Sequence, residues 1–402
     1  MVNLTSPKSV LLIFGTRPEA IKMAPVVLGL KERPDLFEAK VAVTAQHRQM
    51  LDQVLDIFQI SPDYDLDIMT PDQDLFDITS RALLGLKEVL HQERPHLVLV
   101  HGDTTTTFVG ALAAFYERIP VGHVEAGLRT RDKYQPYPEE LNRKLTGALT
   151  DYHFAPTPWA RDNLLAEGVK PENIWVTGNT VIDALQMIAA QVNRNQYQWE
   201  EYLRREQGLT LDGRRLILVT GHRRENFGPG FEEICLALRE LAETFPGIHI
   251  VYPVHLNPNV QEPVYSILTP ACNANTSRQT LCYHDTPNGS RISLLPPLDY
   301  APFVYLLSRS YLVLTDSGGI QEEAPALGKP VLVMREVTER PEGLWAGTVK
   351  LVGAHRDKIV GQTGELLQNP ASYQAMAQAQ NPYGDGRAAQ RIVGIIKNIF
   401  SL

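Results

Sequence analysis

A pair of glycines followed by two glutamates ends one of the apolar runs of this sequence. The segment TDSGGIQEEAPALGKP, residues 315–330, directly follows the apolar residues 311–314. In a parallel α/β sheet, the first turn of the next helix offers free backbone N–H groups and the positive end of the helix dipole. Ser317, Gly318 and Gly319 stand at this turn, where the missing side chains of glycine let phosphate oxygens approach the backbone. We therefore predict an anion-binding turn.

Glu323 lies about one turn further into the same predicted helix. Its carboxylate can accept hydrogen bonds from both hydroxyls of a ribose, which is the group that follows the phosphates in a nucleotide. A simple tight turn, with Glu322 and Glu323 facing solvent, explains this segment equally well when it is taken alone. The other motifs decide between the two interpretations.

Cations follow the first apolar run of each half of the chain. In GTRPEAIKMAP, Gly15 stands at the turn, with Arg17 beside it and Lys22 further along the next helix. Both cations could face a diphosphate, although a solvated Lys22 is the simpler alternative. In VTGHRRENFG, His222 and Arg223 follow a glycine in the same way. A lone histidine is usually structural, but one beside two arginines is a candidate phosphate ligand or acid.

Three further motifs supply carboxylates. Asp103 could cap the next helix, and Glu139 could form a surface ion pair with Arg143, four residues later. Gathered at one site with Glu125, they would suit the chemistry of a nucleotide sugar better than redox chemistry, because no GxGxxG followed by an acidic residue is present. The motifs are HGDTTTTF at 101–108, HVEAGLRT at 123–130 and YPEELNRK at 137–144.

The elements that must position these residues are short runs of Val, Ile and Leu between longer helical patterns. Such runs indicate parallel sheets covered on both faces. At 402 residues and 44% hydrophobic content, the chain can form two cores. We predict an α/β fold of two Rossmann-like domains, with strands in SVLLIFG, EAKVAVTA, HLVLVHGD, YHFAP, NIWVTGN, RLILVTGH, IHIVYPVH, RISLLPP, YLVLTDSGG and KPVLVMR.

The polar segment 189–215 separates the strands of the two halves. We therefore expect domains at 1–182 and 183–385, with a final helix at about 386–402 that could pack on the first domain. Residues 268–290 have many turn residues and little periodicity, so we predict an excursion loop there.

Composition excludes several classes of partner. A net charge of -8 opposes binding to nucleic acid or to an anionic membrane surface. No apolar run approaches the roughly 18 residues of a membrane span, and the N-terminus lacks a long apolar segment with a cleavage site. The three cysteines form no CxxC pair, which argues against structural zinc and for a reducing compartment. We expect a cytoplasmic protein.

Eight motifs, which follow one another over nearly the entire chain, resemble the non-hydrolysing UDP-N-acetylglucosamine 2-epimerase family of bacteria. The resemblance implies a GT-B type fold with the active site in the interdomain cleft, a homodimer, and no cofactor or metal. It also implies reversible epimerisation of UDP-GlcNAc to UDP-ManNAc at C2, by elimination of UDP to 2-acetamidoglucal and re-addition, which would supply surface polysaccharide synthesis. The motifs are GTRPEAIKMAP, TAQHRQML, HGDTTTT, HVEAGLRT, PEELNR, GNTVIDAL, HRREN and TDSGGIQEEAPALGKPVLVMREVTERPE.

The resemblance also assigns roles to single residues. Glu323 would bind the ribose, while Leu298 and Phe303, in PPLDYAPF, would bind uracil. The diphosphate would be held by Arg17, His222, Ser317, Gly318 and Gly319. The catalytic group would be Asp103, Glu125, Glu139, Arg143 and His222. A second, activating UDP-GlcNAc would contact Gln46, His47, Gln49, Gln73, Arg223 and His255.

Two departures from the family pattern bear on these roles. Asp72 stands where some relatives carry an arginine at the activator site, and the 268–290 excursion is longer than usual. Four alternatives remain open at this point: a GT-B glycosyltransferase that needs an acceptor, a hydrolysing epimerase that releases UDP and free ManNAc, a non-catalytic sensor, and an epimerase for a modified UDP-diacetamido sugar acid.

Overall fold

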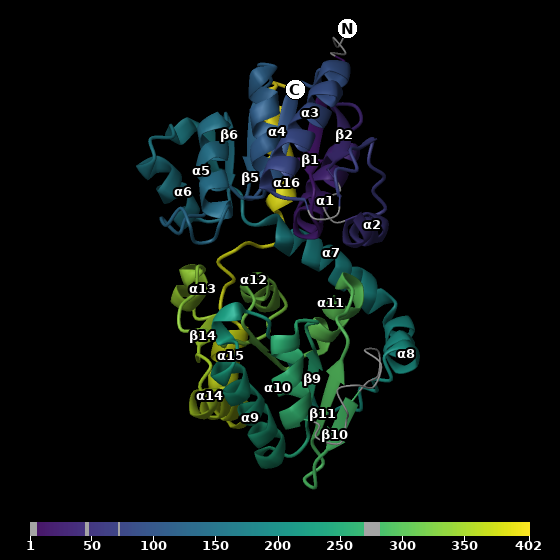
Figure 1. The fold of residues 1–402 in the computed structure, drawn as a ribbon, viewed down its shortest axis with the longest axis vertical. Helices are drawn as coiled ribbons and strands as arrows, with labels where there is room; N and C mark the ends of the chain where they lie inside the picture. The colour runs from purple at the N-terminus through teal and green to yellow at the C-terminus, as the bar shows by residue number, and fades with distance from the viewer. Residues whose placement is uncertain (1–5, 45–47, 71–72, 269–281) are drawn as a thin grey trace. The chain divides into compact units, whose positions relative to one another are not determined.

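The computed structural model describes residues 6–44, 48–70, 73–268 and 282–402, with the backbone alone for 48–50 and 282–284. The chain divides into two compact units (Figure 1). Unit 1 is Met1–Ala184 together with Tyr383–Leu402, and unit 2 is Leu185–Pro382. Each unit has its own seven-stranded sheet.

The sheet of unit 1 has the strand order β3-β2-β1-β4-β5-β6-β7, and all its neighbouring strands are parallel. Helices cover both faces, so its central strands are apolar at nearly every position: Leu11, Ile13, Val98 and Val100 are fully buried. The strands are β1 Lys8–Phe14, β2 Phe37–Val43, β3 Tyr64–Asp65, β4 Leu97–His101, β5 Val121–Val124, β6 Tyr152–Ala155 and β7 Ile174–Val176. The helices are α1 Arg17–Lys31, α2 Arg48–Ile57, α3 Leu75–Glu93, α4 Thr105–Tyr116, α5 Glu139–Leu149, α6 Pro158–Ala166, the 3-10 helix Pro171–Asn173 and α16 Ala388–Ile399.

The last helix of the chain, α16, completes unit 1. It lies against α1, as Figure 1 shows for the yellow and purple helices. Asp183, in α7 (Thr180–Arg194), accepts hydrogen bonds from the backbone N–H groups of Ala388 and Ala389 at 3.1 and 2.9 Å. A carboxylate at these first-turn donors stabilises the start of α16.

The sheet of unit 2 has the order β10-β11-β9-β8-β12-β13-β14, in which only β10 is antiparallel to its neighbour among the described strands. Its strands are β8 Arg215–Thr220, β9 Ile248–Pro253, β10 Cys282–Asp285, β11 Arg291–Leu295, β12 Leu312–Thr315, β13 Val331–Val333 and β14 Val349–Leu351. Its helices are α8 Gln196–Glu206, the 3-10 helix Arg224–Asn226, α9 Pro229–Thr244, α10 Pro258–Leu268, α11 Tyr300–Arg309, α12 Gly318–Ala326, α13 Pro341–Ala346, α14 Arg356–Gln368 and α15 Pro370–Ala377.

The predicted α/β class and all ten predicted strands are confirmed. The prediction of a plain excursion loop at 268–290 is wrong for its final part, because β10 pairs with β11 as an antiparallel hairpin there; residues 269–281 lie outside the described part of the chain. The strands β3, β5 and β14 were not predicted, since they are short or interrupted by glycine, histidine or lysine. Within the described chain, no helix is long and apolar enough to span a membrane.

Candidate active site

Several predicted site residues follow the strands at which the strand order of each sheet reverses: Arg17 after β1, Asp103 after β4, His222 after β8 and Ser317 after β12. In unit 1 the chain moves outward from β1 to β2 and β3, then returns to β4 on the other side of β1. In unit 2 it moves from β8 to β9 and β11, then returns to β12 on the other side of β8. Ligands of open α/β sheets bind beyond the carboxyl ends of the strands at such a switch point. The sheet of each unit therefore has one edge at which a ligand is expected to bind.

In unit 2 the predicted anion-binding turn begins helix α12. Ser317 is the N-cap residue in an extended conformation, and its side chain makes no capping hydrogen bond. A Cβ atom on Gly318 would come within 3.0 Å of both Arg340 Nη1 and Glu339 Oε1, so this position has no room for a side chain. A Cβ on Gly319 would meet nothing within 4 Å. The first-turn N–H groups of α12 thus border open space, as an anion site requires.

The two glutamates that follow the glycines have different surroundings. Both are buried, with exposures of 2% for Glu322 and 7% for Glu323, so neither faces solvent. Glu322 forms a short ion pair with Nε of Arg340. Glu323 accepts a hydrogen bond from the Tyr300 hydroxyl at 2.9 Å. Glu322 therefore anchors the loop between β13 and α13 through Arg340, while Glu323 is held toward α11.

A charged cluster missed by the sequence reasoning lies beside Gly318. Arg335 Nη1 donates to Glu339 Oε2 at 2.7 Å, and Arg340 Nη1 lies 3.0 Å from Glu339 Oε1. Burial alone would raise the pKa of Glu339, but Arg340 and Arg335 outweigh it and lower the pKa to about 2. The sequence signal was the charged run REVTERPE directly after the buried strand β13, at the same edge of the sheet.

His222 and Arg223 follow β8, next to the turn after β12. Their backbone N–H groups both donate to Oδ2 of the buried Asp316, at 2.8 Å. The rings of His222 and the exposed His255 stack with their centroids 5.5 Å apart. Burial lowers the pKa of His222, and Arg223 and His255 act in the same direction, whereas Asp316 raises it. The guanidinium of Arg223 lies 3.7 Å from Glu339 Oε1.

The two residues predicted to bind uracil lie near the start of α11, after β11. Leu298 is in the preceding loop and Phe303 is in the first turn, where its N–H donates to Asp299 O at 3.1 Å. Both side chains are half-buried. Tyr300, in the same turn, bonds to Glu323. The structure thus brings these residues and the α12 turn together at one end of the unit 2 sheet.

In unit 1, Glu125 is the most constrained of the predicted carboxylates. It follows β5 with a φ of 63°, a left-handed conformation that is uncommon for glutamate. Its Oε2 accepts from Lys22 Nζ at 2.5 Å and from Asn179 Nδ2 at 2.8 Å. Nε2 of the buried His101 lies 3.8 Å from the same oxygen. Lys22 therefore contacts a carboxylate instead of remaining solvated.

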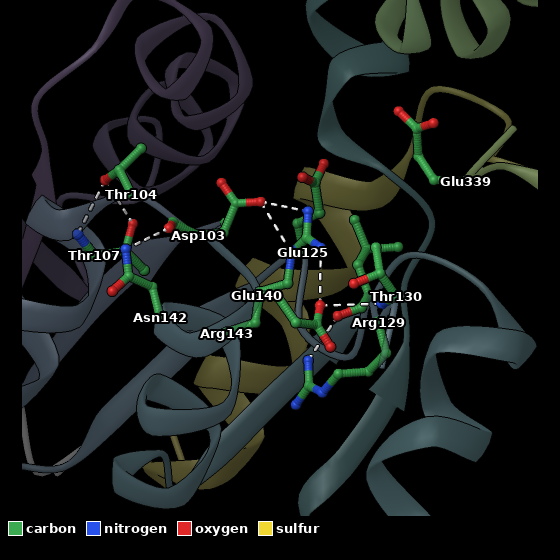
Figure 2. Close-up of polar contacts among 12 residues, drawn as sticks. Asp103, Thr104, Thr107, Glu125, Arg129, Thr130, Glu140, Asn142, Arg143 and Glu339 are labelled. Carbon is green, nitrogen blue, oxygen red and sulfur yellow. Dashed lines mark hydrogen bonds and ion pairs between the residues drawn. The ribbon is translucent and has the colours of Figure 1, made fainter. Parts of the chain in front are cut away.

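Asp103 and Arg143 form the second part of the unit 1 site (Figure 2). Nε and Nη2 of Arg143 donate to Asp103 Oδ2 at 3.0 and 2.6 Å, and its Nη1 donates to Glu140 Oε2 at 3.1 Å. Arg143 thus lies between two carboxylates, and the surface ion pair with Glu139 does not occur in the described chain. Oε2 of Glu139 is buried and has no hydrogen-bond partner among the described residues.

Glu140 fixes the segment between β5 and α5, and sequence reasoning missed it. It is completely buried, and its carboxylate accepts from the N–H groups of Thr130 and Arg131, each at 3.0 Å. Arg129, in the same segment, donates to both oxygens of Glu167 at 2.8 and 2.7 Å, so its role is structural. Glu139 and Glu140 are adjacent and chemically identical, so the sequence does not show which of them is buried.

Glu19 is a second carboxylate that sequence reasoning missed. It is 2% exposed and accepts from Thr16 N at 2.8 Å, from Thr104 Oγ1 at 2.7 Å and from Thr107 Oγ1 at 3.0 Å. It thus joins the turn after β1 to the turn after β4, where Asp103 stands. Burial raises the pKa of Glu19, against these hydrogen bonds. The motif RPEA contained it, but nothing in the motif reveals the threonines as partners.

Arg17, the first residue of α1, makes no side-chain hydrogen bond or ion pair within the described chain, so its guanidinium remains available for a ligand.

Of the residues matched to an activator site, Gln46 and His47 lie outside the described residues, as does Asp72, and Gln49 is described by its backbone alone. Gln73, in unit 1, accepts from the N–H of Thr70 at 3.1 Å. In the described ranges, no group of His, Cys, Asp or Glu has the arrangement of a metal site.

Known proteins resemble this chain over almost its entire length. Residues 29–397 match the family model described as UDP-N-acetylglucosamine 2-epimerase. The UDP-N-acetylglucosamine 2-epimerase of Escherichia coli K12 is 57% identical over 389 residues, which are 97% of this chain and 98% of the relative.

Solved structures give the same result. The UDP-GlcNAc 2-epimerase of Neisseria meningitidis, bound to UDP-GlcNAc, superposes with a TM-score of 0.84 at 48% identity, over 97% of this chain and 100% of that one. A glycosyltransferase from Rickettsia africae superposes with a TM-score of 0.58 at 11% identity, over 98% of this chain and 99% of that one, so it shares the fold alone. The predicted GT-B-like architecture is thereby confirmed.

Proposed function

Because the chain belongs to the UDP-N-acetylglucosamine 2-epimerase family and is therefore an isomerase, we propose that it inverts C2 of UDP-GlcNAc by elimination and re-addition of UDP. The C1–O bond breaks and its electron pair leaves with UDP, while a carboxylate takes the proton from C2. A double bond forms between C1 and C2, giving 2-acetamidoglucal. Re-addition of UDP at C1, with a proton delivered to the opposite face of C2, gives UDP-ManNAc. No external oxidant or reductant is needed.

Unit 2 would bind the nucleotide. The first-turn donors of α12 and His222 would stabilise the charge that develops on the departing diphosphate. Arg17, which belongs to unit 1, would be a further cation for this group. Open space at Gly319, where a Cβ would meet nothing within 4 Å, supports this role. Glu323 would accept hydrogen bonds from the ribose hydroxyls, and the loop of Leu298 with Phe303 would contact uracil.

Unit 1 would perform the proton transfers. The observation that carries this proposal is that the predicted carboxylates differ in their partners. Arg143 holds Asp103 and Lys22 holds Glu125, whereas Oε2 of Glu139 has no partner among the described residues. Carboxylates in different surroundings can act as acid and base in one reaction, which two opposite faces of C2 require.

We also propose that the protein is a cytoplasmic homodimer and that a second molecule of UDP-GlcNAc activates it. The free, buried thiol of Cys235 is compatible with a reducing compartment. Sedimentation equilibrium would test the dimer. A sigmoidal dependence of the initial rate on the concentration of UDP-GlcNAc would support the activating site.

Proton NMR in D2O with UDP-GlcNAc as the only substrate tests the central proposal. We expect UDP-ManNAc to form until equilibrium, with deuterium entering C2 because the proton is exchanged with solvent. UDP-ManNAc without deuterium would contradict exchange by a solvent-connected carboxylate. Free ManNAc and UDP would instead indicate hydrolysis, and product formation only after addition of an acceptor would indicate a glycosyltransferase.

A further inference from the structure

Asp316 is a completely buried carboxylate between the two turns at the switch point of unit 2. Three donors converge on its Oδ2: the N–H groups of His222 and Arg223, both at 2.8 Å, and Nδ2 of Asn226 at 3.4 Å. Its Oδ1 has no hydrogen-bond partner among the described residues. A buried carboxylate oxygen without a donor is costly, so a donor close to Oδ1 would be strongly favoured.

The nearest ring nitrogen to this oxygen is Nδ1 of His222, at 3.5 Å. This is the outer limit of a hydrogen bond, and such contacts often shorten when a ligand binds. The backbone N–H of the same residue is already held by the other carboxylate oxygen, and the ring of His255 stacks on one face of the imidazole. The backbone and the ring plane of His222 are therefore both restrained.

We propose that Asp316 is a positioning residue, which keeps His222 with Nδ1–H directed at Oδ1 and leaves Nε2 for the diphosphate. The proposal rests on the nucleotide-binding role of unit 2. The ionisable groups that act on His222 are Asp316, Arg223 and His255, and only Asp316 favours the imidazolium. When His222 is protonated, Nε2–H becomes a charged donor to the leaving diphosphate, while Asp316 retains the second proton on Nδ1.

The substitution Asp316→Asn tests the proposal well, because the surrounding donors allow only one orientation of the new side-chain amide. Three donors point at the position of Oδ2, so the amide oxygen must occupy that position. The amide NH2 then occupies the position of Oδ1 and faces Nδ1 of His222. Two donors cannot face one another, so in the variant Nδ1 stays unprotonated: the neutral ring carries its proton on Nε2, and the imidazolium is disfavoured. The variant can then offer the diphosphate only a neutral donor, whereas the wild type can offer a charged one.

The first experiment is ¹⁵N–¹H NMR of the histidine side chains in the full-length, ligand-free protein, with His222→Asn used to assign the signals. We expect the Nδ1–H tautomer for neutral His222 in the wild type and the Nε2–H tautomer in Asp316→Asn. A wild-type Nε2–H tautomer would overturn the proposal without any variant, so the test does not depend on the folding of Asp316→Asn. This readout is independent of catalysis and of nucleotide binding.

The second experiment is calorimetric titration of UDP between about pH 5.5 and 8.5, around the usual pKa of histidine. We expect Asp316→Asn to weaken UDP binding about tenfold or more at the acidic end of this range, where the wild type gains most from the imidazolium. In the His222→Asn background the same substitution should have little further effect. An equal loss in both backgrounds would show that Asp316 acts only as a structural residue. Failure of wild-type protein to bind UDP would contradict the proposed function but leave the tautomer result standing.

Discussion

The two units have the same strand order around their switch points but place different chemical groups there. In both, a buried carboxylate joins the two turns. Glu19, after the first strand of unit 1, accepts from the threonines after β4. Asp316, after β12 of unit 2, accepts from backbone N–H groups after β8. Beyond these carboxylates, unit 1 carries the candidate acid–base groups Asp103 and Glu125, each paired with a cation. Unit 2 carries an open helix N-terminus at its glycine pair, beside the ion pairs of Glu339 with Arg335 and Arg340.

This difference shows that the strand order determines where a site can form, while the turns determine its chemistry. The same edge of the sheet holds the acid–base candidates Asp103 and Glu125 in unit 1 and the open turn at Gly319 in unit 2. If this division is correct, substitution of Asp103 or Glu125 in unit 1 should reduce turnover while nucleotide affinity is kept, and substitution of Glu323 or Gly319 in unit 2 should mainly reduce nucleotide affinity.

The largest expected effect is that of Asp103→Asn in unit 1. The amide keeps the shape of the side chain and an acceptor for Arg143, but it cannot transfer a proton at neutral pH. We expect kcat to fall about 10²- to 10⁴-fold, as is typical for loss of a general acid or base. The affinity for UDP, measured by calorimetry, should be unchanged.

The matched control for Asp103→Asn is Asp162→Asn, because Asp162 forms an exposed ion pair with Arg161. Such surface pairs contribute little, so this variant should behave as the wild type. If Asp103→Asn lost UDP affinity as well as turnover, Asp103 would take part in nucleotide binding. This result would contradict the proposed division of roles between the units.

The pH dependence of stability should also differ between the units. Burial lowers the pKa of His101 and His153 to about 4 and that of His123 to about 3, all in unit 1. In unit 2, burial lowers the pKa of His249 to about 4 and also lowers the pKa of His222. Between about pH 6.5 and 4 the unfolded chain binds more protons than the folded chain, so stability falls as the pH decreases. The loss is at most about 1.4 kcal/mol per pH unit for each histidine.

Native-state hydrogen exchange at about pH 7 and pH 5 can measure this difference strand by strand. We expect a larger loss of protection in β4, β5 and β6 than in β8 and β9. His153→Gln should reduce the pH dependence of unit 1, whereas His91→Gln, at an exposed histidine paired with Glu117, should not. Equal acid sensitivity of the two units would contradict the expectation.

In unit 2, Glu323→Ala should mainly affect nucleotide binding. Loss of charge-assisted hydrogen bonds to a ribose should raise the Kd for UDP about 10- to 100-fold. The wild type should also prefer UDP to 2′-deoxy-UDP, and this preference should shrink in the variant. Tyr300→Phe is the control, because it removes the 2.9 Å hydrogen bond to Glu323 but keeps the carboxylate. Equal losses in both variants would indicate that Glu323 acts through Tyr300.

The smallest expected effect is that of Gly319→Ala. A methyl group there meets no atom within 4 Å, and alanine is a better helix residue than glycine, so stability should be unchanged or should rise by about 0.5–1 kcal/mol. The methyl group would nevertheless enter the space proposed for the phosphate, and we expect about tenfold weaker UDP binding. Thermal unfolding and calorimetry would measure both quantities. UDP binding equal to that of the wild type would place the phosphate elsewhere.

The sequence by itself determined the class of the fold, the ten main strands and the glycine pair at the start of a helix. These features are local: an apolar run buried on both faces and a glycine pair at a helix start can be recognised without knowing any distant partner. The short strand β5 was missed because Gly122 and His123 interrupt its apolar pattern. The order of the motifs was also sufficient for the family, which the comparisons confirmed.

Only the tertiary structure decided which side chains are paired. Helical periodicity puts Glu139 and Arg143 on one face, yet Arg143 binds Asp103, 40 residues away, because the sheet places β4 beside β1 and α5 beside α4. Glu19 and Asp316 likewise gain their roles from turns that are distant in sequence. Local sequence fixes backbone conformation, but the partner of a buried charge depends on which turns the strand order brings together, and burial makes that partner obligatory.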